Sequence, residues 1–170
     1  MGPDSSQRIL MPVRLRTVAA SFVIALLFNF LPWPDLRVVP DLVSLVLVFW
    51  CVRQPRMVGL GTGWVLGLLY DAGNGVLLGQ HALAYSLLAF FAMTLSRRIL
   101  WFSLWGQALH VVLLLVGAQA VAVLVRVVAG AEFPGWSIFV GPLIAAALWP
   151  PATLLLLIPQ QRRVSAEEVG

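Results

Sequence analysis

Long apolar runs separated by short polar gaps make up most of this sequence. A helix needs roughly 20 apolar residues to cross a bilayer, so runs of about this length predict transmembrane helices. The second and third runs are short, and we expect them to tilt little, to thin the bilayer locally, or to form a hairpin packed deep among the others. The pattern predicts an all-α integral membrane protein with one polytopic domain over residues 1–170. Its six expected spans are 13–31, 38–52, 57–70, 76–95, 101–128 and 136–158.

The arginines lie in alternate gaps between these runs, and this placement predicts the topology. Gaps rich in arginine face the cytoplasm under the positive-inside rule. Both termini are therefore expected in the cytoplasm, and the number of spans is even. The arginines on this side are Arg8, Arg14, Arg16, Arg53, Arg56, Arg97, Arg98, Arg162 and Arg163. The opposite gaps carry Asp35, Asp41, Asp71, Glu132, Arg37 and Arg126.

The composition agrees with a membrane protein and excludes several other classes. A chain that is 61% hydrophobic and 11% charged has too little polar surface for a soluble globule. The net charge of +4 does not indicate nucleic-acid binding, because the arginines are scattered at the ends of apolar runs, where they face anionic lipid headgroups. The single Cys51 excludes an internal disulfide. The first run is expected to be an uncleaved signal anchor.

Prolines predict a bend in the last run. Pro142, Pro150 and Pro151 all fall within 136–158. Because proline has no backbone N–H, the last two must interrupt the helical hydrogen bonds and bend this span.

Three glycines recur at steps of four in the third run, at Gly59, Gly63 and Gly67. Such a stripe lies on one helix face and lets another backbone approach closely. The simpler interpretation is packing inside the protein's own bundle, and the alternative is contact with a partner's helix. Gly79 repeats the spacing from Gly75, although Gly73-Asn74-Gly75 is more simply an external turn.

A few ionisable residues lie near the outer ends of the runs. Asp71 is either a functional group, as intramembrane carboxylates often are, or a cap that binds nearby backbone amides. A pair between Asp71 and Arg126 is a further possibility. Asp41 is expected to cap the second helix. His81 is expected to be a buried hydrogen-bonding residue, and His110 is expected to form a polar stripe with Gln107 and Gln119.

Catalysis finds little support among these residues. An intramembrane aspartyl protease needs two carboxylates that share one site, and Asp41 is a poor second member for Asp71. A serine nucleophile elbow is missing from the sequence, and two isolated histidines do not predict a metal site. We therefore expect no enzymatic activity, no cofactor and no metal.

Several short motifs follow one another between residues 40 and 98: Pro40-Asp41, Arg53-Gln54-Pro55-Arg56 with Val58-Gly59, Gly67-Leu68-Leu69-Tyr70-Asp71, and Leu78-Gly79-Gln80-His81-Ala82-Leu83. In their order and spacing, this part of the sequence resembles the family of the rod shape-determining protein MreD. The family often has proline where this chain has Leu78. MreD proteins are small, with about six membrane helices, so the resemblance extends over nearly the whole chain.

The resemblance implies a scaffold of the bacterial cell-elongation machinery in the inner membrane. MreD-like proteins bind the bitopic protein MreC directly, in an assembly with MreB, RodA and a class B penicillin-binding transpeptidase. The expected contact residues are Gly59, Gly63, Gly67, Asp71, Gly79 and His81, with Asp41 and Arg126 as structural polar residues, and a homodimer is possible. The family's fold is similar to the substrate-binding subunit of energy-coupling-factor transporters. That similarity implies the alternative function, a carrier of a vitamin-type small molecule, whose binding site would use Asn29, Asp71, Asn74, His81 and Arg126.

Overall fold

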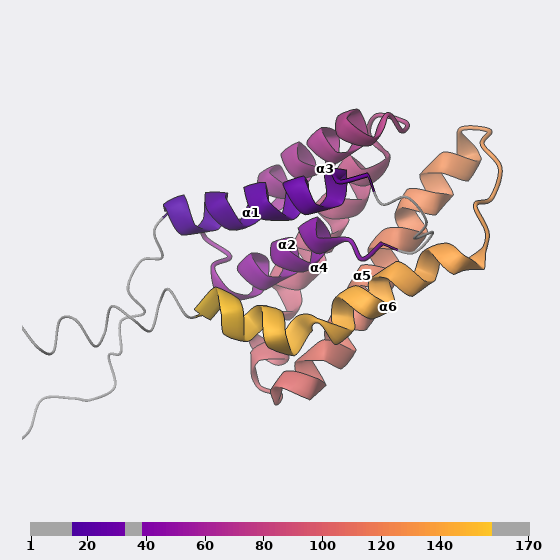
Figure 1. Ribbon diagram of the computed structural model, residues 1–170. Coiled ribbons are helices and arrows are strands. Elements are labelled where there is room, and N and C mark those ends of the chain that lie inside the picture. Colours follow the sequence, from indigo (N-terminus) through magenta and orange to yellow (C-terminus); the bar gives the residue numbers. More distant parts are fainter. Residues whose placement is uncertain (1–14, 33–38, 158–170) are drawn as a thin grey trace, which may run out of the picture.

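The computed structural model describes residues 15–32 and 39–157, and all regular structure within these ranges is helical (Figure 1). The expectation of an all-α protein is confirmed for this part of the chain. The helices are α1 (Leu15–Phe30), α2 (Leu42–Arg53), α3 (Leu60–Asn74), α4 (Gln80–Leu100), α5 (Leu104–Val128), the 3-10 helix η1 (Trp136–Phe139) and α6 (Val140–Ala147), followed by a last helical segment, Trp149–Leu157. The predictions for Arg8, Arg14, Asp35, Arg37, Arg162, Arg163 and both termini lie outside the described residues.

Two helices, α4 and α5, are long and apolar enough to cross a membrane, and the bent pair Trp136–Ala147 and Trp149–Leu157 adds a third candidate span. Helices α1 and α2 are apolar but shorter. The count of six spans therefore stays a prediction. Helix α1 begins and the last helical segment ends at the same end of the bundle, as an even number of crossings requires (Figure 1).

Helices α3, α4 and α5 begin at Leu60, Gln80 and Leu104, later than the predicted starts at 57, 76 and 101, and two helices extend past the C-terminal limits of their apolar runs. Helix α4 continues through Arg97 and Arg98 to Leu100, although the fourth run ends at residue 95. Arginine is a good helix former and is favoured in a last turn, so the helix extends past its apolar part. Helix α3 likewise continues through Asn74 and ends at Gly75, whose φ of 61° is the left-handed conformation of a glycine C-cap. The external turn therefore begins after Asn74.

The predicted bend in the last run is confirmed. The helix is interrupted at Leu148, and the two halves differ in direction by 44°. Pro150 and Pro151 follow the interruption directly and cannot donate backbone hydrogen bonds to the preceding turn.

The centre of the bundle is α2, which packs against α1, α4, α5 and α6. Val43, Leu47, Trp50 and Cys51 on this helix are buried. The Trp50 indole donates to Ser21 Oγ of α1 at 2.8 Å. A helix that is surrounded by others does not have to match the thickness of the bilayer. The position of α2 therefore agrees with deep packing among the other helices, one of the three alternatives for the short second run.

The glycine stripe packs against α4. A Cβ on Gly63 would lie 2.6 Å from the carbonyl oxygen of Tyr85, and one on Gly67 would overlap the backbone of Ala82. At Gly59 the nearest atom is the sulfur of Met93, at 3.4 Å. Internal packing of the stripe is thereby confirmed, whereas direct contact of these glycines with a partner stays a prediction.

We predict that Gly63→Ala lowers the free energy of unfolding by about 1–3 kcal/mol relative to Gly61→Ala. Both substitutions gain the same helix propensity, but the space in front of Gly61 is open, whereas at Gly63 the methyl group meets α4 backbone. Thermal and denaturant unfolding of the two purified variants in detergent measures the difference. Equal stability would show that α3 and α4 are not in such close contact.

Candidate functional site

Asp41 links three helices at one end of the bundle. As predicted, it is the N-cap of α2, where Oδ1 accepts from the backbone N–H groups of Val43 (3.0 Å) and Ser44 (3.2 Å). The same oxygen accepts from the Asn29 amide of α1 at 3.0 Å. Oδ2 accepts from the Tyr85 hydroxyl of α4 at 2.6 Å. One carboxylate thus fixes the relative positions of α1, α2 and α4.

Asp71 is fully buried, with 0% of its surface exposed, near the end of α3. Its carboxylate accepts from the backbone N–H groups of Gly79 (2.9 Å), His81 (3.1 Å) and Ala82 (3.4 Å), and His81 Nδ1 lies 2.7 Å away. These amides lie at the start of α4, where the backbone N–H groups have no hydrogen-bond partner within the helix. The prediction that Asp71 binds nearby backbone amides is confirmed, and the cap serves the following helix.

Three aromatic rings fill the space between the two carboxylates. The ring centroids of Tyr70 and His81 are 4.5 Å apart, those of Tyr70 and Tyr85 5.9 Å, and those of His81 and Tyr85 5.8 Å. The His81 ring joins the cluster through Nδ1, which lies at hydrogen-bond distance from Asp71 Oδ1. The two carboxylates are therefore connected through one continuous cluster of side chains. We call it the carboxylate cluster, and its members are Asp41, Tyr85, His81, Asp71 and Tyr70.

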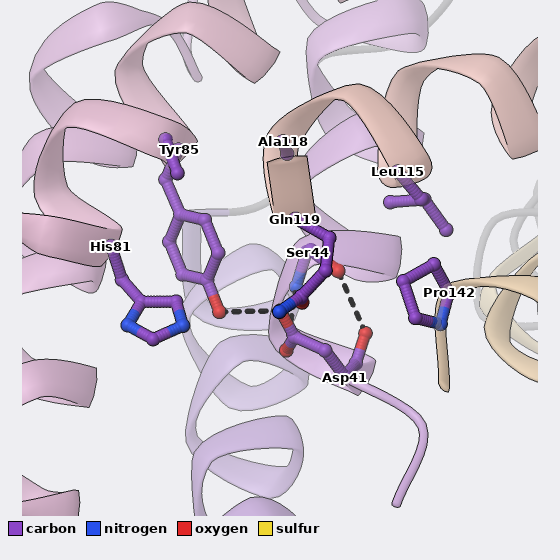
Figure 2. A pocket seen from close by; sticks show the side chains of 9 residues that line it. Asp41, Ser44, His81, Tyr85, Leu115, Ala118, Gln119 and Pro142 are labelled. Carbon is purple, nitrogen blue, oxygen red and sulfur yellow. Dashed lines mark hydrogen bonds between the residues drawn. The ribbon is translucent and has the colours of Figure 1, made fainter. Parts of the chain in front are cut away.

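A small polar cavity adjoins this cluster (Figure 2). In the close view, the Tyr85 hydroxyl points towards Asp41, and His81 lies beside Tyr85. The cavity volume is about 10 Å³, which is at the lower limit for one water molecule. Sites for drug-sized ligands measure about 300–1,000 Å³. The polar residues that line the cavity are Asp41, Ser44, His81, Tyr85 and Gln119.

An apolar groove forms a second candidate site, between α4 and α5. Its volume is about 330 Å³. Gly117 lies in its lining, and a Cβ built there meets no atom within 4 Å. The other lining residues are Leu87, Leu88, Phe91, Leu113, Leu114, Ala118 and Val121.

The structure brings some of the predicted site residues together and separates others. Asp71, Gly79 and His81 meet at the turn between α3 and α4, where Gly79 has a φ of 99°. Arg126 lies in the last turn of α5. Within residues 15–32 and 39–157, His81–Asp71 is the only contact between a basic and an acidic side chain within 4.0 Å. The proposed pair of Asp71 with Arg126 is therefore wrong, because Asp71 is already occupied by His81 and by α4 amides.

The polar stripe expected on α5 is present only in part. Gln107 accepts a hydrogen bond from the Trp149 indole at 3.2 Å and so joins two helices. His110 Nδ1 instead lies 2.9 Å from the carbonyl of Gly106 in its own helix. Gln119 lines the polar cavity.

Sequence reasoning missed Tyr85 as a site residue. His81 and Tyr85 are four residues apart, which places them on the same face of a helix. That spacing was the available signal, but it does not show that the hydroxyl reaches Asp41. In the described part of the chain, no group of three or more His, Cys, Asp or Glu side chains is arranged to hold a metal ion.

Comparison with known proteins gives two matches that agree with each other. The family model described as "rod shape-determining protein MreD" matches residues 10–158. The protein named "Rod shape-determining protein MreD" from Haemophilus influenzae is 32% identical over 142 residues, which cover 82% of this chain and 88% of that protein. No solved structure matches the chain significantly.

We predict that Tyr85→Phe lowers the free energy of unfolding by about 1.5–3 kcal/mol, because it leaves an oxygen of a partly buried carboxylate without its donor. Ser86→Ala is the matched control, since it removes a neighbouring hydroxyl whose bond goes to its own helix at Ala82. Denaturant titration in detergent measures both variants.

A double-mutant cycle with Asp41→Asn tests the same hydrogen bond directly. The two substitutions should be non-additive, since they remove the same interaction. Additive effects, or an equal loss in Ser86→Ala, would contradict the role of Tyr85.

Proposed function

The chain belongs to the MreD family of rod shape-determining proteins, and from this premise we propose that it is a non-enzymatic scaffold of the cell-elongation machinery. It is a multi-pass protein of the bacterial inner membrane with both termini in the cytoplasm. It binds MreC directly and controls how MreC is presented to the cell-wall synthases. MreB, RodA and a class B penicillin-binding transpeptidase belong to the same assembly.

The observation that carries this proposal is the apolar groove between α4 and α5. Membrane helices associate by close packing, and small residues let the two backbones approach. Gly117 has open space in front of it, and α4 and α5 are the two helices long enough to line a partner across the bilayer. A bitopic partner has a single membrane helix, and we place that helix in this groove.

The predicted contact residues on α3 act indirectly in this proposal. Gly63 and Gly67 are covered by α4, so a partner helix reaches them only if α4 moves away. Asp71, Gly79 and His81 hold the turn that leads into α4. These residues therefore support MreC binding by fixing the position of the groove.

The carrier alternative loses support from the same structure. Four of its five candidate residues are engaged within the protein: Asp71 with His81, Asn29 with Asp41, and Asn74 with the carbonyl of Tyr70. The polar cavity beside them, at about 10 Å³, is far below the volume of a vitamin site.

We predict that Gly117→Leu weakens binding to MreC about tenfold or more, because the added side chain occupies the space of the partner's backbone. Gly61→Leu is the matched control, since it makes the same change at an open position on α3. Co-purification of MreC from detergent-solubilised membranes measures the effect, and cell shape in a strain carrying only the variant tests its consequence.

Two results would contradict this assignment. Unchanged recovery of MreC with Gly117→Leu would exclude the groove as its binding site. Loss of self-association with intact MreC binding would assign the groove to a homodimer. A stoichiometric small molecule retained in native mass spectrometry would contradict the scaffold function itself.

A further inference from the structure

Positive charge at one end of the bundle has no acidic partner within the segments that the structure describes. The acidic residues of the described segments are Asp41, Asp71 and Glu132. None of them lies at the helix ends where these arginines are found. The counter-ions for this end must therefore come from elsewhere. The arginines concerned are Arg16 in the first turn of α1, Arg53 at the end of α2, Arg56 between α2 and α3, and Arg97 and Arg98 in the last turn of α4.

Arg53 differs from the other arginines at this end. Arg16, Arg56, Arg97 and Arg98 are exposed, whereas Arg53 is partly buried. Its Nε is buried and has no hydrogen-bond partner, while the residue as a whole keeps part of its surface accessible. A guanidinium group that is withdrawn from water without a partner is unfavourable, and an anion at its accessible edge would relieve this cost.

Aromatic packing holds the Arg53 side chain in place. Its guanidinium carbon lies 5.2 Å from the centroid of the Phe49 ring, in a cation–π arrangement. Phe49 is itself fixed between Trp50, at 5.0 Å, and Trp149, at 6.2 Å between centroids. The planar group is therefore positioned before any ligand arrives, which lowers the entropy that binding would lose.

The depth of Arg53 in the membrane indicates which anion it meets. The same end of the bundle exposes Trp101, with 91% of its surface accessible, and Trp105. Exposed tryptophans mark the headgroup layer of a bilayer. The anions present at that depth are the phosphates of phospholipids, and basic pockets on the cytoplasmic side bind anionic headgroups.

We propose that Arg53 is a binding site for the phosphate of an anionic phospholipid, with the guanidinium stacked on Phe49 and its terminal nitrogens donating to two phosphate oxygens. Guanidinium geometry suits such paired hydrogen bonds. The neighbouring exposed arginines add long-range attraction, but they do not form the site. This lipid site is separate from the groove between α4 and α5 and does not depend on the scaffold function.

Native mass spectrometry of the full-length protein tests this site with two lipids, phosphatidylglycerol and the zwitterionic phosphatidylcholine. Wild-type protein should retain one phosphatidylglycerol molecule in preference to phosphatidylcholine. Arg53→Gln should lower the affinity for phosphatidylglycerol about tenfold or more, while Arg56→Gln, the matched control in the loop that follows α2, should change it less than about twofold. Arg53→Lys should lose most of the preference although it keeps the charge, because an ammonium group lacks the paired geometry.

Several outcomes would overturn the proposal. Equal losses with Arg53→Gln and Arg56→Gln, or full retention with Arg53→Lys, would mean diffuse surface attraction without a site. Displacement of the lipid by inorganic phosphate would mean a site for a free anion. Tighter lipid binding in a Glu167→Gln, Glu168→Gln variant would mean that carboxylates of the chain itself occupy the position.

Discussion

The arrangement of the bundle depends on satisfying two carboxylates inside an apolar protein. A charged group that is withdrawn from water is costly unless hydrogen bonds replace its hydration. Asp71 receives the backbone N–H groups that open α4, and this contact is possible only because α3 and α4 approach closely one turn earlier, where Gly67 touches Ala82. The glycine stripe and the buried acid are therefore parts of one device, since Asp71 continues the four-residue spacing of Gly63 and Gly67 on the same helix face.

Asp41 is the second of the two carboxylates, and its hydrogen bonds also hold neighbouring helices together. It caps α2 and binds α1 and α4 through Asn29 and Tyr85. The two ends of the bundle consequently differ in their electrostatics. At one end Asp41 and Asp71 are satisfied by hydrogen bonds within the protein, and at the other the arginines have no acidic partner in the described residues. That difference fits a protein whose two ends face different surroundings, one of which supplies anions.

Local patterns in the sequence predicted those features that depend on neighbouring residues. The N-cap at Asp41, the close-packed face of Gly63 and Gly67, and the bend near Pro150 each follow from spacing or from proline chemistry, and the structure confirms them. Hydropathy marks the limits of the apolar runs but not the ends of helices, so the extension of α4 was missed. The choice of His81 over Arg126 as partner of Asp71, and the contact of Tyr85 with Asp41 across 44 residues, depend on tertiary packing that no local pattern contains.

Helix α4 connects the carboxylate cluster to the proposed partner groove. Its first turns supply His81 and Tyr85, and its later turns supply Leu87 and Phe91 to the groove. A shift of α4 away from α2 and α3 would remove every donor of Asp71 and the Tyr85 hydroxyl from Asp41, so Asp71 would be left without donors in an apolar environment. The wall that α4 contributes to the groove is therefore held rigidly. A partner helix that binds in this groove meets a fixed surface, as expected of a scaffold. A carrier that opens and closes around its cargo would lack such a surface.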